Sequence, residues 1–238
     1  MIWIHGLGEQ SASFDAIARH RQLAGYSHVL VDLPGYGRAP WPAACASLEH
    51  TADMLARWID ERPSDDQNLP VLIGHSQGGV LATLVAERTA VRAVVNIDGN
   101  LTIGDCTFSL TAKRYTAEQF AAHGFAAMRD DVYRDGLVAR ALRGYHAAMC
   151  LASPEVFHRN ASDLVAASER GDLASRFVAL RCPKLFIAGS PHGICERSRA
   201  LLTELRANWV AIEPSGHWPF VDQPDAFASE VAEFLRGM

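Results

Sequence analysis

Short apolar segments alternate with longer amphipathic stretches along most of this chain. The apolar segments are rich in Val, Ile and Leu and cover residues 2–5, 28–32, 70–75, 91–97, 184–189 and 209–213. Such segments are typical of strands that are buried on both faces of a parallel sheet. Between them, apolar residues recur at helical spacing, as at Phe227, Val231 and Leu235. This alternation predicts an α/β fold, with helices flanking a mostly parallel sheet.

One long region departs from this alternation, because residues 101–177 contain no convincing strand pattern. They carry helix-start signals instead, namely a capping box from Thr116 to Gln119 and an N-cap at Ser153 followed by Pro154. One helical face is predicted from Val138, Leu142, Tyr145 and Met149. We therefore expect a single domain whose core comprises residues 1–100 and 178–238, with residues 101–177 inserted between strands as a helical cap.

Composition narrows the functional class. The 238 residues have a formal net charge of −5 and no basic stripe, so we expect a small-molecule substrate and no nucleic-acid partner. No signal peptide and no apolar run of about 18 residues is visible, so we expect no membrane segment. The five cysteines include no CxxC pair, which is typical of reduced thiols in a cytoplasmic protein. We find no metal-ligand cluster or dinucleotide fingerprint, so we expect no metal and no cofactor.

A serine flanked by glycines stands between a predicted strand and a predicted helix, in the segment Gly74-His75-Ser76-Gln77-Gly78. A turn this sharp strains the backbone, and side chains at positions 74 and 78 would collide with neighbouring main chain. The turn presents the serine hydroxyl at the carboxyl end of the strand, beside the free N–H groups of the helix start. This pattern predicts a nucleophilic serine. We expect the neighbouring His75 to pack or hydrogen-bond locally.

Three further segments extend this pattern: HGLG at residues 5–8, DLPGYGR at 32–38, and GHWP at 216–219 followed by QPDAF at 223–227. Together they resemble the α/β-hydrolase fold superfamily, specifically serine hydrolases with a helical cap. The resemblance implies that Ser76 is the nucleophile and His217 its general base, with an oxyanion hole formed by the backbone amides of Leu7 and Gln77. The residues that would shape the turn and the oxyanion loop are Gly74, Gly78, His5 and Gly6.

Two residues are candidates for the acid of the catalytic triad, because the position where the family usually carries it is occupied by His192. Asp98 follows the predicted strand 91–97, and some members of the family carry their acid there. Glu196 is the alternative, but an acidic residue in a first helical turn is favoured by the helix dipole alone. We favour Asp98, because strand ends in this architecture carry function. Its role would be to fix the tautomer of His217.

The resemblance implies hydrolysis of a carboxylic ester, thioester or lactone of a small, largely apolar substrate through an acyl-Ser76 intermediate. The N-terminal half also resembles menaquinone-pathway lyases of this fold, so C–C bond hydrolysis or lyase chemistry by the same Ser–His pair is an alternative. A non-catalytic, ligand-binding member of the fold is a second alternative.

The family's sheet normally begins with two strands before the HG motif, whereas His5 is only the fifth residue here. The strand at residues 28–32 would then form the edge of the sheet. An exposed apolar edge invites pairing with another chain. We therefore expect either a homodimer through this edge or a local shield over it.

Overall fold

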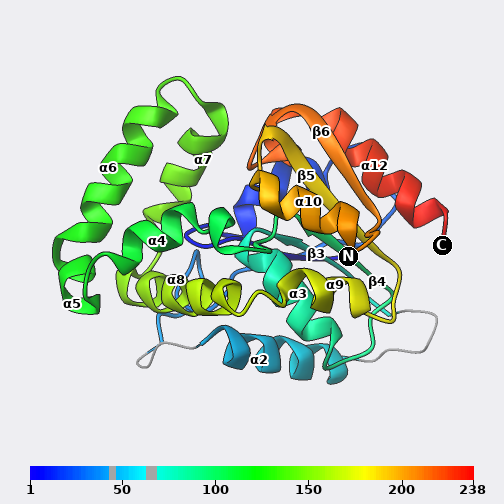
Figure 1. The fold of residues 1–238 in the computed structure, drawn as a ribbon, viewed down its shortest axis with the longest axis horizontal. Helices are drawn as coiled ribbons and strands as arrows, with labels where there is room; N and C mark the ends of the chain where they lie inside the picture. Colours follow the sequence, from blue (N-terminus) through cyan, green and yellow to red (C-terminus); the bar gives the residue numbers. More distant parts are fainter. Residues whose placement is uncertain (43–46, 63–68) are drawn as a thin grey trace.

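The structure, a computed structural model, describes residues 1–42, 47–62 and 69–238. Its centre is a parallel sheet with the strand order β2-β1-β3-β4-β5-β6 (Figure 1). The strands are β1 (Ile2–Ile4), β2 (Val29–Val31), β3 (Val71–His75), β4 (Ala93–Ile97), β5 (Lys184–His192) and β6 (Trp209–Gly216). Each lies on a predicted apolar segment. The predicted α/β class is therefore confirmed.

The last two strands run beyond their predicted ends at residues 189 and 213. The ladder between β5 and β6 continues past an irregularity at Gly189 and Pro191, through the pair formed by His192 and Gly216. Pro191 and His192 are exposed, so this part of the sheet extends out of the core and does not need apolar side chains. An apolar pattern could not reveal it.

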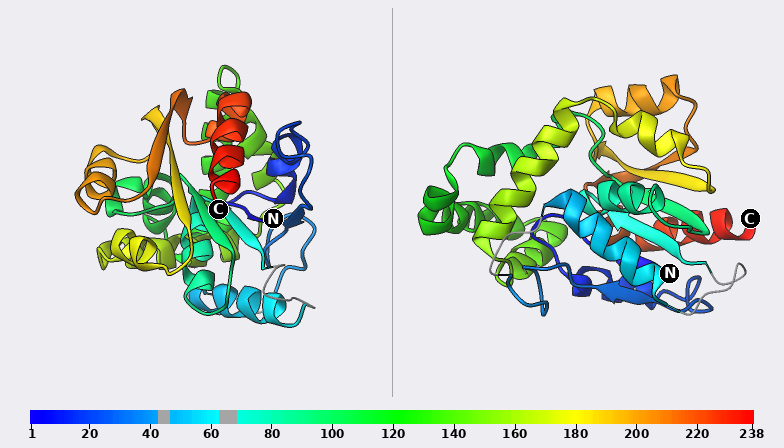
Figure 2. Two further views of the ribbon diagram at one scale, coloured as in Figure 1. Left: turned by 90° about the vertical axis from the view of Figure 1, so that its right-hand side faces the viewer. Right: turned by 90° about the horizontal axis from the view of Figure 1, so that it is seen from below.

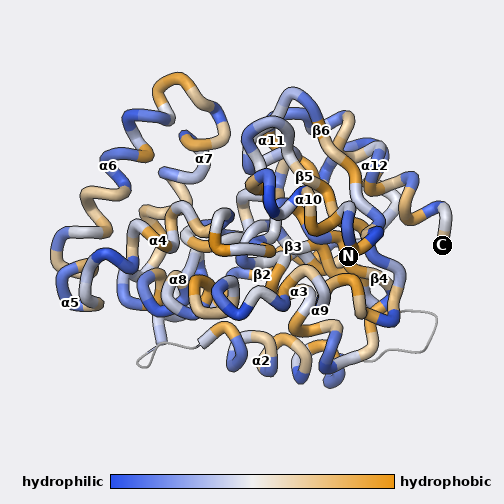
Figure 3. Tube along the Cα trace, viewed as in Figure 1, coloured by the Kyte–Doolittle hydropathy of each residue, from blue (hydrophilic) through white to orange (hydrophobic). Residues whose placement is uncertain are grey.

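Helices cover both faces of the sheet (Figure 2). One face carries α2 (Leu48–Asp60), α3 (Gln77–Ala86), α9 (Leu173–Ala179) and α10 (Glu196–Glu204), and the other carries α1 (Asp15–Ala18) and α12 (Pro224–Arg236). In α12 the predicted apolar face is buried at Phe227, Val231 and Leu235. Figure 3 shows the hydrophobic residues concentrated on the central strands and alternating with hydrophilic ones along α2. The core thus lies between the sheet and its helices.

The elements between β4 and β5 are helical throughout. They are η2 (Ile103–Asp105), α4 (Thr107–Lys113), α5 (Ala117–Gln119), the π-helical turn η3 (Phe120–Gly124), α6 (Phe125–Gly136), α7 (Arg140–Met149), α8 (Pro154–Glu169) and α9. The predicted capping box at Thr116 is present, and Ser153 caps α8 with Pro154 in its first turn. The predicted boundary at residue 177 lies inside α9, which packs against α3 and α10.

One predicted helical face is partly wrong. Tyr145 and Met149 are buried on α7 as expected, but Val138 is 92% exposed and precedes the helix, which begins at Arg140. The chain reverses direction between α6 and α7 at this point, so the helical spacing does not extend back to Val138 (Figure 1).

β2 lies at the edge of the sheet, as predicted, and its residues are only half-buried. Among the described residues, no helix combines the length and apolar character that crossing a membrane requires. Four of the five cysteines are free thiols, namely Cys106, Cys150, Cys182 and Cys195. Cys45 lies outside the described residues.

Candidate active site

Ser76 occupies the predicted turn between β3 and α3, with the backbone angles φ 54° and ψ −121°. A side chain at Gly74 would place its Cβ 2.0 Å from the carbonyl oxygen of Gly78, and one at Gly78 would place it 2.0 Å from that of Ile4. Both neighbours are main-chain atoms that cannot move aside. The glycines are therefore sterically required, and the turn holds Ser76 at the carboxyl end of the sheet.

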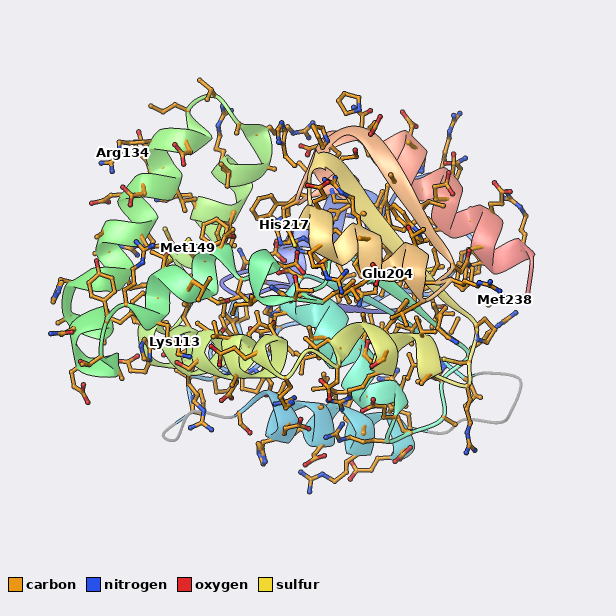
Figure 4. All side chains as sticks on the ribbon, viewed as in Figure 1. Lys113, Arg134, Met149, Glu204, His217 and Met238 are labelled. Carbon is orange, nitrogen blue, oxygen red and sulfur yellow. The ribbon has the colours of Figure 1, made fainter. Side chains whose placement is uncertain are left out.

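Ser76 and His217 line the same pocket. Figure 4 shows His217 between the sheet and the helices α4 and α7. The apolar part of the wall comes from Leu7 and Trp218 in the core and from Phe108, Tyr145 and Leu164 in the helical segment 101–177. The polar part comes from Asn100, Asp105, Thr107 and Ser109, together with Glu9 and His75. Both parts of the chain therefore enclose the nucleophile.

Asp98 and His217 approach each other from the ends of neighbouring strands. Asp98 follows β4, and its Oδ2 atom lies 3.8 Å from Nδ1 of His217, which directly follows β6. This distance is longer than a hydrogen bond, so the two groups are adjacent but not bonded. Asp98 is fully buried and accepts the N–H groups of Gly189 at 3.1 Å and Ile194 at 3.0 Å.

The turn after β5 encloses the Asp98 carboxylate. A Cβ at Gly193 would lie 2.6 Å from either carboxylate oxygen, so only glycine allows this close approach. His192, at the position where the family usually carries its acid, is exposed. Glu196 is exposed in the first turn of α10, whereas Asp98 is the carboxylate beside His217. The geometry thus favours Asp98 among the alternatives.

Burial governs the protonation of both groups. It raises the pKa of Asp98 to about 8, because the two backbone N–H groups compensate only partly for lost hydration. Burial lowers the pKa of His217, and the charge of His75 lowers it further. The resting site therefore holds a neutral imidazole that can accept a proton.

The oxyanion loop is fixed by hydrogen bonds of His5. Its ring Nδ1 lies 2.8 Å from the Gly6 carbonyl oxygen, and its Nε2 accepts the N–H of Leu33 at 3.0 Å. This arrangement suits the expected role of His5 and Gly6 in loop shape. Leu7 follows and lines the pocket. Gln77 is the first residue of α3, so its N–H has no acceptor within the helix.

Glu9 is a buried residue that the sequence analysis missed. It is 2% exposed, and its carboxylate accepts the Gly6 N–H at 2.7 Å, His75 Nδ1 at 2.8 Å and the indole N–H of Trp218. His75 in turn donates from Nε2 to the main-chain oxygen of His217 at 2.7 Å. The contacts of His75 are therefore long-range in the chain rather than local. The only signal in the sequence was an acidic residue directly after the HGLG segment.

Comparison with known proteins shows which family has this architecture. The alpha/beta hydrolase family model matches residues 1–230. A pimeloyl-[acyl-carrier protein] methyl ester esterase from Pectobacterium carotovorum is 27% identical, over 99% of this chain and 94% of its own length. An esterase structure from Thermogutta terrifontis superposes with a TM-score of 0.79 at 22% identity, over 99% of this chain and 89% of that one. MenH from S. aureus superposes with a TM-score of 0.76 at 17% identity, over 99% and 92%.

The two structural likenesses concern the fold alone, whereas the family model covers nearly the whole chain. The predicted resemblance to the α/β-hydrolase fold superfamily is confirmed, and the similarity to esterases supports the interpretation that this chain is a hydrolase. This chain belongs to the alpha/beta hydrolase family.

Proposed function

We propose that this protein is a serine hydrolase that cleaves a carboxylic ester through an acyl-Ser76 intermediate. One observation carries the proposal: Ser76 stands in a strained turn at the head of α3 and shares a pocket with His217, whose ring lies 3.8 Å from the buried Asp98. A nucleophile, a base and an acid thus come from the ends of three strands.

The chemistry follows from these positions. As the Ser76 Oγ forms a bond to the ester carbonyl carbon, His217 takes the hydroxyl proton. The carbonyl oxygen becomes negative and is stabilised by the N–H groups of Leu7 and Gln77. Collapse of this intermediate breaks the bond to the alcohol, which leaves with the proton from His217. A water molecule, deprotonated by His217, then releases the acid and restores Ser76.

Asp98 stabilises the imidazolium that forms during each half of the reaction. Its carboxylate must be ionised for this role, and the 3.8 Å separation from His217 must close to a hydrogen bond. Because the two side chains are already adjacent, a movement of His217 by about 1 Å would bring them within hydrogen-bond distance. The two backbone N–H groups hold Asp98 in place meanwhile.

The pocket favours a compact, largely apolar substrate. Phe108, Tyr145 and Leu164 form much of its apolar wall and belong to the helical segment 101–177, which we infer acts as a cap over Ser76. The curated relative acts on a methyl ester, so methyl esters are the first substrates to assay. Thioesters and lactones share the acyl-transfer chemistry and complete the panel.

The test compares the wild-type protein with Ser76→Ala on this panel. We expect the substitution to lower kcat by at least about 10³-fold. A fluorophosphonate probe should label only the wild-type protein, and mass spectrometry should trap the acyl-enzyme during turnover. Labelling of wild type no faster than of Ser76→Ala would refute catalysis at this serine. Turnover without an acyl-enzyme would favour lyase chemistry by the same pair.

A further inference from the structure

A second buried carboxylate–imidazole pair lies directly beside Ser76, and the hydrolytic steps do not use it. Glu9 is 2% exposed and His75 is 1% exposed, with 2.8 Å between the carboxylate and Nδ1. Two ionisable groups buried this deeply are costly unless their hydrogen bonds are complete. Their partners therefore indicate what the pair holds in place.

Those partners belong to two different loops, and His75 itself lies at the end of a third segment, β3. Glu9 accepts the N–H of Gly6 in the oxyanion loop after β1 and the indole N–H of Trp218 in the loop after β6. His75, the residue before Ser76 at the end of β3, donates to the main-chain oxygen of His217 at 2.7 Å. The pair thus connects the oxyanion loop, the nucleophile turn and the histidine loop.

The hydrogen bonds also determine the charge of the pair. The carbonyl oxygen of His217 can only accept, so Nε2 of His75 carries a hydrogen. An ionised Glu9 can only accept, so Nδ1 carries one as well. His75 is therefore an imidazolium. Burial opposes this state, but the charge of Glu9 raises the pKa of His75, and the pKa of Glu9 falls to about 2.

Asp98 is the other ionisable group whose charge acts on His75, and the charge of His75 in turn acts on His217 and His5. Asp98 also raises the pKa of His75, but Glu9 raises it more. The cation at His75 lowers the pKa of both His217 and His5. Glu9 raises the pKa of His217, but by less than His75 lowers it, so the ion pair as a whole helps to keep the proposed base neutral.

We propose that Glu9 and His75 form a positioning pair, which sets the main chain of His217 and the oxyanion loop relative to Ser76. This inference rests on the proposed function of Ser76 and His217. The ring of His217 is not hydrogen-bonded to Asp98 at 3.8 Å, so its place depends on how its main chain is held. Likewise, the bond from Gly6 to Glu9 orients the next peptide group, which carries the N–H of Leu7.

Substitution Glu9→Gln separates charge from shape. Glutamine has almost the same volume and can still accept the Gly6 N–H, but it removes the negative charge that holds the second proton on His75. The matched control is Thr83→Val, which keeps the side-chain shape and removes one buried hydrogen bond, from Thr83 Oγ1 to the Gly79 carbonyl within α3. Both variants are first checked for folding by circular dichroism.

We expect Glu9→Gln to lower kcat for the active ester by roughly 10- to 100-fold, because a small misplacement of reacting groups is enough for such a loss. KM should stay within about twofold, and the pH dependence of kcat should change. Thr83→Val should match wild type in kcat, in KM and in the pH dependence of kcat. A folded Glu9→Gln protein with wild-type kcat and pH profile would overturn the proposal. Should Glu9→Gln fail to fold, His75→Gln carries the same test.

The charge of the pair has a readout that does not need activity. Nitrogen-15 spectra of labelled histidine distinguish imidazolium from the neutral tautomers, and the His75 signal is assigned by its loss in His75→Gln. We expect His75 to be protonated on both nitrogens at about pH 7 in wild type and neutral in Glu9→Gln. A neutral His75 at about pH 7 in wild type would overturn the pair. If Ser76→Ala proved to be active, the proposed function of Ser76 would be refuted. The nitrogen-15 spectrum of His75 would still test whether Glu9 and His75 form an ion pair.

Discussion

Two buried carboxylates near Ser76 have opposite protonation because of their immediate partners. Asp98 has two backbone N–H donors and a neutral imidazole 3.8 Å away, and burial raises its pKa to about 8. Glu9 has three donors, one of them on a cation 2.8 Å away, and its pKa falls to about 2. A charged partner at hydrogen-bond distance therefore outweighs burial, whereas a more distant neutral one does not.

The choice between the two candidate acids is testable by substitution. Asp98→Asn should lower kcat by roughly 10²- to 10⁴-fold, because asparagine can neither stabilise the imidazolium nor enforce the required tautomer of His217. Glu196→Gln changes an exposed side chain and should leave kcat within about twofold. Steady-state kinetics on the active ester compare the two. Full activity in Asp98→Asn would show that Asp98 is not the acid of the catalytic triad.

The raised pKa of Asp98 predicts how activity depends on pH. Asp98 must be ionised to stabilise the imidazolium, and its pKa is raised to about 8. We therefore expect kcat/KM to rise with pH up to about that value. The apparent pKa belongs to the coupled pair of Asp98 and His217. A profile that is flat from about pH 5 upward would contradict this expectation.

The same shift predicts how stability depends on pH. Between the ordinary value of 3.8 and about 8, folded Asp98 binds more protons than the unfolded chain does. The free energy of unfolding should therefore fall as pH rises through this window, and Asp98→Asn should remove that slope. The Tm of Asp98→Asn relative to wild type should thus rise by more than about 2 °C between acidic and mildly alkaline pH. A constant difference in thermal melts would be the contrary result.

At the scale of the elements, the turn between β3 and α3 can form only because its glycines pack directly against main-chain atoms. A Cβ at Gly78 would lie 2.0 Å from the main-chain oxygen of Ile4 in β1 and 2.8 Å from that of His5. The helix after the nucleophile can therefore pack against β1 only when position 78 has no side chain. Close packing of α3, β3 and β1 is what places Ser76 beside the oxyanion loop.

Two glycine-to-alanine substitutions test this interpretation. Gly78→Ala should destabilise the fold by about 1–3 kcal/mol through overpacking and lower the rate of fluorophosphonate labelling. Gly144 lies within α7 with open space around its Cα, so Gly144→Ala should stabilise the protein by about 0.5–1 kcal/mol. Urea unfolding measures both. Equal changes in the free energy of unfolding for the two substitutions would contradict this interpretation, because the structure would then accommodate a Cβ at position 78 without a cost in stability.

At the scale of the whole molecule, the sheet ends at β2, a short strand whose side chains are half-buried and which pairs on one side with β1. We propose that a second copy covers this edge in a homodimer, because an apolar edge strand offers unpaired N–H and C=O groups.

Size-exclusion chromatography tests the dimer against a chain mass of 25.9 kDa. We expect the wild-type protein to elute as a dimer, and Leu30→Lys, which places a charge in the edge strand, to shift it toward the monomer. Elution of wild type as a monomer at high concentration would refute the dimer.

The sequence by itself determined the order of strands and helices, the turn at Ser76 and the place of His217. These features depend on neighbouring residues, through apolar periodicity, capping signals and the glycines that a sharp turn requires. Asp98 was favoured over Glu196 because it follows a predicted strand, but no local pattern could show which of the two carboxylates reaches His217.

The tertiary structure decided which groups meet. It brought Asp98 beside His217 and linked Glu9 to His75 and Trp218, partners that lie 66 and 209 positions away in the chain. It also exposed Val138, which a helical pattern had placed on a buried face. Contacts of this kind depend on the order in which parallel strands pair, and no periodicity in the sequence encodes that order.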